Sequence, residues 1–387
     1  MKNFDFQCKT RLIFGENSVK GLKNMISGNY KNILLHYGGG SIKKYGLYNQ
    51  VIQILGKENV NVFELSGVEP NPKLSLVKEG IKISRENNID LILAVGGGSV
   101  IDSAKAIGIG AKYEEDVWDF FTGKAEPKES LPVGVILTIP ATGSETSTGS
   151  VITNEDGLYK RSLRSNEMRP VFAIMDPKLT LTLPDKQTFA GIMDMLSHIF
   201  ERYFTNTPNV DFIDHMSEGA MKSIIKNAYA LKKDPQNYNA RSEIMLAGTI
   251  AHNGVLGIGR EEDWASHKIG HEIGALYGET HGVTLAIVFP AWMKYVYKVD
   301  IDRFVRFATK VFDVSAEGKN KNEIVLEGIG KFEDFLHRIG LPTSFIEGNL
   351  PTDKFELMAD KATEEGPIGS FKKLFKEDVV NIYKLAL

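Results

Sequence analysis

The chain has 387 residues and a formal net charge of −3 at pH 7, with 42% hydrophobic and 25% charged residues. This composition is that of an ordinary folded protein, and the length predicts two domains. The 46 lysines and arginines are spread along the sequence, which argues against a nucleic-acid-binding protein, because such proteins cluster their positive charge. The chain has one cysteine, Cys8, and shows neither a signal-peptide pattern nor an apolar run of about 20 residues. We therefore expect a cytoplasmic protein that has no internal disulfide and binds no membrane.

The first half of the sequence predicts an α/β domain with a parallel sheet. Short apolar segments alternate with helix-like segments and glycine-rich turns, which is the pattern of successive β-α-β units. The expected strands cover residues 31–37, 59–65, 90–95, 133–140 and 172–177. Residues 150–163 depart from this pattern and predict a β-hairpin with Asp156-Gly157 at its turn.

The second half has almost no strand pattern and predicts a domain built from helices. Residues 185–204 carry apolar side chains at helical spacing, namely Phe189, Ile192, Met193, Leu196, Ile199, Phe200 and Tyr203. Similar patterns cover residues 217–234, 240–255, 302–312, 322–340 and 376–387. We place the domain boundary at Pro184-Asp185, so that the domains are residues 1–184 and 185–387, with Asp185 as a possible cap of the first helix.

Two of the expected strands end in Gly-Gly-Gly-Ser and lead into a helix, a sequence that is suited to binding phosphate. Glycines let the backbone approach an anion closely, and a helix N-terminus offers N–H groups and the positive end of its dipole. The residues are Gly38, Gly39, Gly40 and Ser41 in the first loop and Gly96, Gly97, Gly98 and Ser99 in the second. The fingerprint G-x-G-x-x-G is absent from both, and a single such loop is as readily an ordinary strand–helix turn. Two of them in one parallel sheet favour a nucleotide.

Further residues near these loops are candidates for cofactor contacts. Asp102, in the first turn of the second helix, either caps that helix or accepts a hydrogen bond from a ribose or nicotinamide group. The small residues of the first loop are followed by Lys43 and Lys44, which favours NADP because a 2′-phosphate needs room and positive charge. Alternatively, both lysines only face solvent. A third loop, residues 136–150, is either a generic loop rich in hydroxyl groups or a further cofactor contact through Thr138, Thr142, Ser144 and Ser147.

Two pairs of polar residues have the spacing of metal ligands on a helix. Asp194 and His198 form one pair and His267 and His271 form the other, so that each pair points to one side of its helix. One pair alone is more often a hydrogen-bonded helix pair, but two pairs in a chain with eight histidines favour a metal site. The zinc-protease pattern His-Glu-x-x-His fails, because the second histidine is replaced by Ala275. One carboxylate with two or three imidazoles suits Fe²⁺ and Zn²⁺ equally.

Together these motifs resemble the iron-containing (group III) alcohol dehydrogenases, most nearly their NADPH-dependent butanol dehydrogenase and aldehyde reductase branch. The resemblance covers essentially the whole chain and includes D-x-x-x-H at 194–198, the histidines between 267 and 281, GGGSVIDSAK and PATGSETS. It implies a Rossmann-like dinucleotide-binding domain over residues 1–184. It also implies an all-helical metal-binding and substrate domain over residues 185–387, in an architecture shared with dehydroquinate synthase.

The resemblance also implies roles for individual residues. The family's metal ligands fall on Asp194, His198, His267 and His281. His271 then lies beside the metal and takes part in substrate or proton transfer. Residues 96–99 fall on the pyrophosphate loop, and Gly39 stands where family members that prefer NAD carry an acid, in agreement with NADP. Lys160, in the hairpin, matches a lysine near the nicotinamide ribose.

The implied activity is reversible hydride transfer between NADP(H) and a primary alcohol or aldehyde. One Fe²⁺ or Zn²⁺ would act as a Lewis acid on a small-molecule substrate, and the implied assembly is a homodimer. Two other readings are open. One is a different metal-dependent enzyme of the same fold, similar to glycerol dehydrogenase or dehydroquinate synthase. The other is a nucleotide-binding sensor without catalysis, in which the histidines are structural.

Overall fold

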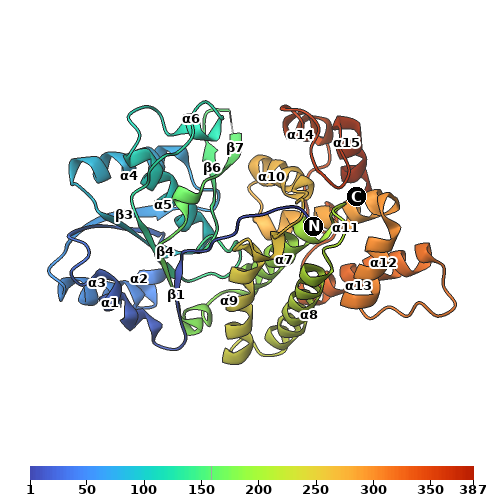
Figure 1. Cartoon of the computed structure of the whole chain (residues 1–387), viewed down its shortest axis with the longest axis horizontal. Helices are drawn as coiled ribbons and strands as arrows, with labels where there is room; N and C mark the ends of the chain where they lie inside the picture. The colour runs from blue at the N-terminus through green and yellow to red at the C-terminus, as the bar shows by residue number, and fades with distance from the viewer. Residues whose placement is uncertain (158) are drawn as a thin grey trace. The chain divides into compact units, whose positions relative to one another are not determined.

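The computed structural model describes residues 1–157 and 159–387, and these residues form two compact units. One unit is Gln7–Thr182, and the other joins Met1–Phe6 to Leu183–Leu387. In Figure 1 the first unit runs from blue to green, and the second runs from green to red apart from its dark blue N-terminal segment. The assignment of cofactor binding to residues 1–184 and of metal and substrate binding to residues 185–387 stays a prediction.

A six-stranded parallel sheet with the strand order β1-β8-β5-β4-β2-β3 forms the centre of the unit Gln7–Thr182. The strands are β1 Arg11–Phe14, β2 Asn32–Gly38, β3 Asn61–Val68, β4 Leu91–Gly96, β5 Val133–Leu137 and β8 Phe172–Met175. This sheet confirms the predicted Rossmann-like α/β fold. β1 was not predicted, because it has only four residues and lies at the edge of the sheet, where most of its side chains are exposed.

Helices cover both faces of this sheet, which explains why its inner strands are largely apolar. All six residues of β4 are buried. On β2, Leu35 packs in a cluster with residues of α1 and α3, whereas the next residue, His36, bonds to Ser103 of α5. The helices of this unit are α1 Leu22–Ile26, α2 Ser41–Lys44, α3 Leu47–Gly56, α4 Leu74–Glu86, α5 Gly98–Ala111 and α6 Trp118–Phe121. Short 3-10 helices cover Ser18–Gly21, Asn166–Met168 and Pro177–Thr180.

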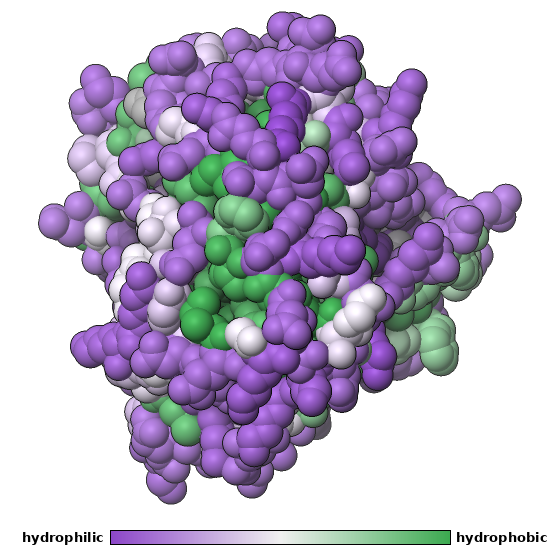
Figure 2. Space-filling view, turned by 90° about the vertical axis from the view of Figure 1, so that its left-hand side faces the viewer, coloured by the Kyte–Doolittle hydropathy of each residue, from purple (hydrophilic) through white to green (hydrophobic). Residues whose placement is uncertain are grey.

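The second edge of the sheet and the predicted hairpin complete this unit. β3 is the outer strand at that edge, and its residues Val62 and Phe63 are half-buried. Figure 2 views the molecule from the side on which β3 lies in Figure 1, and it shows apolar residues gathered in the middle of a hydrophilic face. The hairpin is present as β6 Gly149–Asn154 and β7 Tyr159–Arg164, which pair antiparallel with Thr153 opposite Lys160.

The unit that contains Leu183–Leu387 is helical, as predicted. Its helices are α7 Asp185–Tyr203, α8 Asp211–Lys233, α9 Tyr238–His252, α10 Ala265–Tyr277, α11 His281–Val296, α12 Ile301–Val311, α13 Lys321–Ile339, α14 Phe355–Ala362 and α15 Lys376–Leu385. Short 3-10 helices cover Val255–Gly257 and Tyr297–Val299. Among the described residues, no helix combines the length and the apolar character that a membrane span requires.

α7 is the central helix of this unit, and its residues are buried on all sides from Thr188 to Tyr203. Phe200 packs edge-to-face against aromatic rings from α11, α12 and α13, namely Phe289, Phe307 and Phe332. The prediction that Asp185 caps this helix is wrong, because Pro184 is the N-cap and makes no side-chain cap bond. Asp185 lies instead in the first turn, where a carboxylate interacts favourably with the helix dipole.

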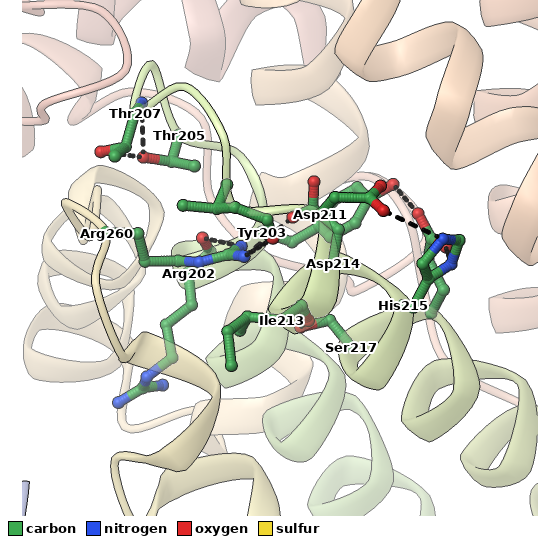
Figure 3. Close-up of polar contacts among 12 residues, drawn as sticks. Arg202, Tyr203, Thr205, Thr207, Asp211, Ile213, Asp214, His215, Ser217 and Arg260 are labelled. Carbon is green, nitrogen blue, oxygen red and sulfur yellow. Dashed lines mark hydrogen bonds and ion pairs between the residues drawn. The ribbon is translucent and has the colours of Figure 1, made fainter. Parts of the chain in front are cut away.

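A buried ionic network fixes the segment before α10 to α7 and α8 (Figure 3). Asp214 on α8 pairs with Arg260, Oδ1 to Nη2 at 2.9 Å, and with Arg303 of α12 at 2.5 Å. Arg260 also donates hydrogen bonds to the carbonyl oxygens of Arg202, at 3.0 Å, and Val210, at 3.1 Å. The segment that leads into α10 is therefore held by charge as well as by packing.

His36 is a fully buried, titratable group in the core of the parallel sheet. Its Nδ1 lies 2.9 Å from the carbonyl oxygen of Leu65, and its Nε2 lies 2.8 Å from the hydroxyl of Ser103. A neutral ring satisfies both contacts by donating from Nδ1 and accepting at Nε2. Burial lowers the pKa of His36 from its ordinary value of 6.5 to about 4, although the hydrogen bond to Leu65 raises it.

Replacing His36 with asparagine is therefore expected to weaken the pH dependence of stability. Because folding lowers the pKa of His36, the unfolded chain binds a proton at mildly acidic pH that the folded protein does not bind. Protonation therefore stabilises the unfolded state, and the free energy of unfolding falls as the pH falls. Between about pH 8 and pH 5, His36 should cost the wild-type protein roughly 2 kcal/mol of unfolding free energy. His36→Asn should be less stable at both pH values but should not show this loss. Urea unfolding of both proteins at both pH values measures the difference, and equal losses would contradict it.

Candidate functional site

Three of the four predicted metal ligands converge in the helical unit. Asp194 lies on α7, His267 on α10, and His281 is the first residue of α11. A carboxylate oxygen of Asp194 and one ring nitrogen from each histidine all lie within 4.8 Å of one another. Asp194 and His267 are buried, and His281 is half-buried. One carboxylate and two imidazoles, contributed by three helices, thus point at a common centre.

The fourth predicted ligand, His198, lies against this group without belonging to the set of atoms within 4.8 Å. It follows Asp194 by one helical turn on α7, and its Nε2 is 3.7 Å from Asp194 Oδ1. Its ring centroid is 5.0 Å from that of His267. Burial, helped by the neighbouring histidines, lowers the pKa of His198 well below its ordinary value. The ring is therefore neutral at physiological pH, which is the form that binds a metal.

The close packing of α11 on α7 brings His281 to Asp194. Gly282, the residue after His281, lies so near α7 that a Cβ at this position would overlap the carbonyl group of Ala190. His281 Nε2 is consequently 3.7 Å from the same Asp194 oxygen that His198 approaches. The glycine is required here because no side chain fits between the two backbones.

His271 lies beside the group, one turn after His267 on α10. Its ring centroid is 5.1 Å from that of His281 and 6.3 Å from that of His267. The residue is half-buried, unlike His267. The two histidines of the H-x-x-x-H motif therefore differ in position. His267 belongs to the group of converging atoms, whereas His271 lies next to this group.

The sequence analysis missed two residues at this site. Glu201 is 1% exposed, and its Oε1 accepts hydrogen bonds from both the backbone N–H and the ring Nδ1 of His267, at 3.0 and 2.7 Å. Burial raises the pKa of Glu201 to about 8, although hydrogen bonds from the backbone N–H groups of His267 and Trp264 lower it. His252 of α9 has its ring centroid 4.0 Å from that of His198. The sequence could have indicated Glu201, because it follows His198 by three residues on the predicted helix and so lies on the same face. No sequence pattern indicated His252.

The three predicted cofactor loops lie together in the other unit. They follow β2, β4 and β5, which are adjacent parallel strands, so their carboxyl ends share one edge of the sheet. The second and third loops are in contact, because a Cβ on Gly97 would overlap Ile139 and one on Gly98 would overlap Thr142. Thr138 N donates to the carbonyl oxygen of Gly96 at 3.0 Å. The first loop is open, and a Cβ on either Gly39 or Gly40 would have no atom within 4 Å.

Asp102 and Lys105 of α5 hold the third loop in place. The Asp102 carboxylate accepts hydrogen bonds from the Ser144 hydroxyl at 2.5 Å and from the backbone N–H of Val151 at 3.0 Å. Lys105 is fully buried and donates to the Ser144 hydroxyl at 2.8 Å and to the carbonyl oxygen of Ser147 at 3.0 Å. Burial lowers the pKa of Lys105 to about 8, while the charge of Asp102 raises it. Lys105 was not predicted, and the contact of Asp102 with a cofactor stays a prediction.

The remaining candidates lie at the borders of these loops. Ser41 begins α2 and is exposed. Lys43 and Lys44 are both exposed, and their Nζ atoms lie 4.7 Å and 5.3 Å from the ring centroids of Tyr48 and Tyr45. Lys160, on β7, donates from Nζ to the side-chain oxygen of Asn71 at 2.8 Å. Each of these groups is anchored in the same unit as the three loops.

Comparison with known proteins gives matches over nearly the whole chain. Residues 9–177 match the model of the iron-containing alcohol dehydrogenases, and residues 188–387 match the C-terminal model of the Fe-containing alcohol dehydrogenase family. The probable NADH-dependent butanol dehydrogenase 1 of Bacillus subtilis (strain 168) is 46% identical over 100% of both chains. The NADPH-dependent aldehyde reductase YqhD of Escherichia coli (strain K12) is 36% identical over 95% of this chain and 94% of its own length.

A solved structure shows the same fold. The crystal structure of NADH-dependent butanol dehydrogenase A from Thermotoga maritima superposes with a TM-score of 0.96. It is 39% identical and covers 100% of this chain, which in turn covers 99% of that chain. The likeness therefore extends to both units.

Proposed function

This chain belongs to the iron-containing alcohol dehydrogenase family, and we propose that it transfers a hydride reversibly between NADP(H) and a primary alcohol or aldehyde. Membership of the family makes it an oxidoreductase of the alcohol dehydrogenase type, with a nicotinamide cofactor and a metal. The proposal adds the form of the cofactor, the ligands of the metal and the class of substrate. The observation that carries it is the convergence of Asp194, His267 and His281 within 4.8 Å.

The donor atoms at this centre fit one Fe²⁺ or Zn²⁺. A carboxylate with imidazoles suits these ions, whereas Mg²⁺ and Ca²⁺ prefer oxygen ligands alone. Nε2 of His198 and Nε2 of His281 each lie 3.7 Å from Oδ1 of Asp194, a distance that is too long for a hydrogen bond but suits two ligands of one ion. We propose the ligand set Asp194, His198, His267 and His281. When bound, the ion would polarise the carbonyl oxygen of the substrate and stabilise the negative charge that develops there.

His271 would carry the proton of the reaction. Its ring borders His281 and is half-buried, so that it has contact with the centre and with solvent. Imidazole exchanges protons readily near neutral pH. In the reducing direction His271 would deliver a proton towards the alcohol oxygen, and in the oxidising direction it would take this proton to solvent.

The loops at the edge of the parallel sheet would hold the dinucleotide. Residues 96–99 lead into α5, a helix of 14 residues, whose N-terminal N–H groups suit a pyrophosphate. Glycine is required at positions 97 and 98 because a side chain there would overlap Ile139 or Thr142 of the third loop. Contacts with the rest of the cofactor are proposed for Asp102, Thr138, Thr142, Ser144, Ser147 and Lys160.

The first loop supports NADP(H) over NAD(H). Gly39 and Gly40 have open space around them, and Lys43 and Lys44 bring positive charge close to the loop. An acidic side chain, which would repel a 2′-phosphate, is missing from residues 38–44. The names of the relatives differ on this point, since the Bacillus subtilis protein is called NADH-dependent and the Escherichia coli protein NADPH-dependent. A direct measurement is therefore decisive.

A homodimer is also part of the proposal. β1 lies at one edge of the sheet, and its side chains Leu12 and Phe14 are 40% and 43% exposed. An apolar edge strand of this kind is suited to pairing with a second copy of the chain. Light scattering after size-exclusion chromatography tests it, and a monomeric mass would contradict it.

Separate alanine variants test the different roles of His267 and His271. His267→Ala is expected to lose the metal, because it removes one of the converging donors. His271→Ala should retain the metal but reduce kcat by about 10²-fold, since only proton transfer is impaired. Metal content and NADPH oxidation by butanal are measured on the same samples, with His337→Ala on the exposed face of α13 as the control. Equal metal loss in the first two variants, or no turnover of any aldehyde by the wild type, would contradict the assignment.

The cofactor assignment is tested by an acid in the first loop. The wild type should show the higher kcat/KM with NADPH. Gly39→Asp should lower kcat/KM for NADPH by roughly 10-fold or more through charge repulsion, with a much smaller effect on NADH. Gly56→Asp is a matched control, because a side chain at Gly56 also meets open space but lies at the end of α3. A wild-type preference for NADH would overturn the reading of this loop.

A further inference from the structure

We propose that Glu201 positions His267 as a metal ligand and fixes which of its ring nitrogens faces the metal. This inference rests on the proposed metal site. Glu201 is not among the converging donors, and its role is to hold one of them in place. It is therefore a positioning residue, which acts through His267 and not on the substrate.

The carboxylate of Glu201 is bound at both of its oxygens. Oε1 accepts the backbone N–H of His267 at 3.0 Å and its ring Nδ1–H at 2.7 Å, and Oε2 accepts the backbone N–H of Trp264 at 2.6 Å. Glu201 is 1% exposed, so water does not compete for these contacts. These three hydrogen bonds fix the position of the carboxylate. Because the ring must reach this fixed acceptor, the side chain of His267 is restricted to one orientation.

The bond to Nδ1 also decides the tautomer of His267. Both oxygens of Glu201 already accept backbone N–H groups, Oε1 from His267 and Oε2 from Trp264, so Glu201 acts as an acceptor here and the shared proton resides on Nδ1 of the ring. The lone pair of the neutral ring then lies on Nε2, and only a nitrogen with a lone pair binds a metal. Glu201 thereby directs Nε2 towards the centre formed with Asp194 and His281.

The position of Glu201 on α7 links it to the other donors. Asp194, His198 and Glu201 follow one another at intervals of four and three residues, which places all three on one face of the helix. α7 would thus supply two ligands and also the group that orients a third, which belongs to α10. A single helix then sets the geometry of most of the site.

A purely structural role is the competing explanation, because Glu201 also binds the N-terminus of α10. Trp264 is the N-cap of this helix, and His267 is its third residue. Asp263 offers a matched control, since it is also buried at this helix end. Its carboxylate bonds to the backbone N–H groups of Ala265, Ser370 and Phe371. The two carboxylates have similar surroundings but different partners, because only Glu201 contacts a ring.

The first experiment compares metal affinity in Glu201→Gln and Asp263→Asn. Apoprotein is titrated with Co²⁺ or Zn²⁺ against a competing chelator, and the d–d absorption of the Co²⁺ form is recorded. Glu201→Gln is expected to raise the Kd by about 10- to 100-fold and to change the spectrum, whereas Asp263→Asn should alter neither. Thermal unfolding of both apoproteins reports the structural effect separately. An unchanged Kd in Glu201→Gln, or an equal rise in Asp263→Asn, would overturn the proposal.

The second experiment uses the wild type and does not depend on the folding of a variant. Long-range ¹H–¹⁵N spectra of histidine-labelled, Zn²⁺-loaded protein should show a proton on Nδ1 of His267 that exchanges slowly with water. A proton on Nε2 instead would overturn the role of Glu201. If wild-type apoprotein bound no Co²⁺ or Zn²⁺ at all, the proposed metal site would fail as well, so the two failures are distinguishable.

Discussion

The burial of Asp194 in the middle of α7 is the constraint on which the arrangement of the helical unit depends. Its side chain is 4% exposed on a helix that is otherwise surrounded largely by apolar residues. A carboxylate in such surroundings is costly unless positive groups or hydrogen-bond donors compensate its charge. His198 and His281 approach the same oxygen of Asp194, each at 3.7 Å. The close packing of α11 on α7, with Gly282 at the contact, brings His281 to this carboxylate, and in the proposed site a metal ion between these groups would compensate its charge.

The unit Gln7–Thr182 also contains buried charged side chains, namely Asp102 and Lys105 of α5. Lys105 is buried within α5, and its ammonium group is compensated by Asp102 and by hydroxyl and carbonyl oxygens of the third loop. These two buried side chains therefore hold the third loop in place. The glycines at the start of α5 let the third loop lie close to the helix, because a side chain at Gly97 or Gly98 would overlap Ile139 or Thr142.

The sequence allowed the fold class to be predicted, along with those parts of the candidate site that lie within one element. Inner strands such as β4 are recognisable because burial on both faces makes them apolar throughout, whereas the edge strand β1 has no such signature. Asp194 and His198 were recognisable because helical spacing alone brings them together. The contacts of Glu201 and His252 were not, because they join α7 to α10 and α9 to α7, and such pairings arise only from tertiary packing. The roles of the candidate residues remain predictions.

The backbone of Trp264 shows how closely Glu201 is tied to the start of α10. Trp264 has a φ of 65°, a left-handed conformation that costs a bulky residue roughly 1–2 kcal/mol. Such a conformation persists only where surrounding contacts determine it. Glu201 supplies those contacts, since its oxygens bind the N–H group of Trp264 itself and that of His267, three residues later. The indole N–H adds a hydrogen bond to Glu262 at 2.6 Å. The backbone at the start of α10 and the His267 ring therefore share one carboxylate as their hydrogen-bond partner.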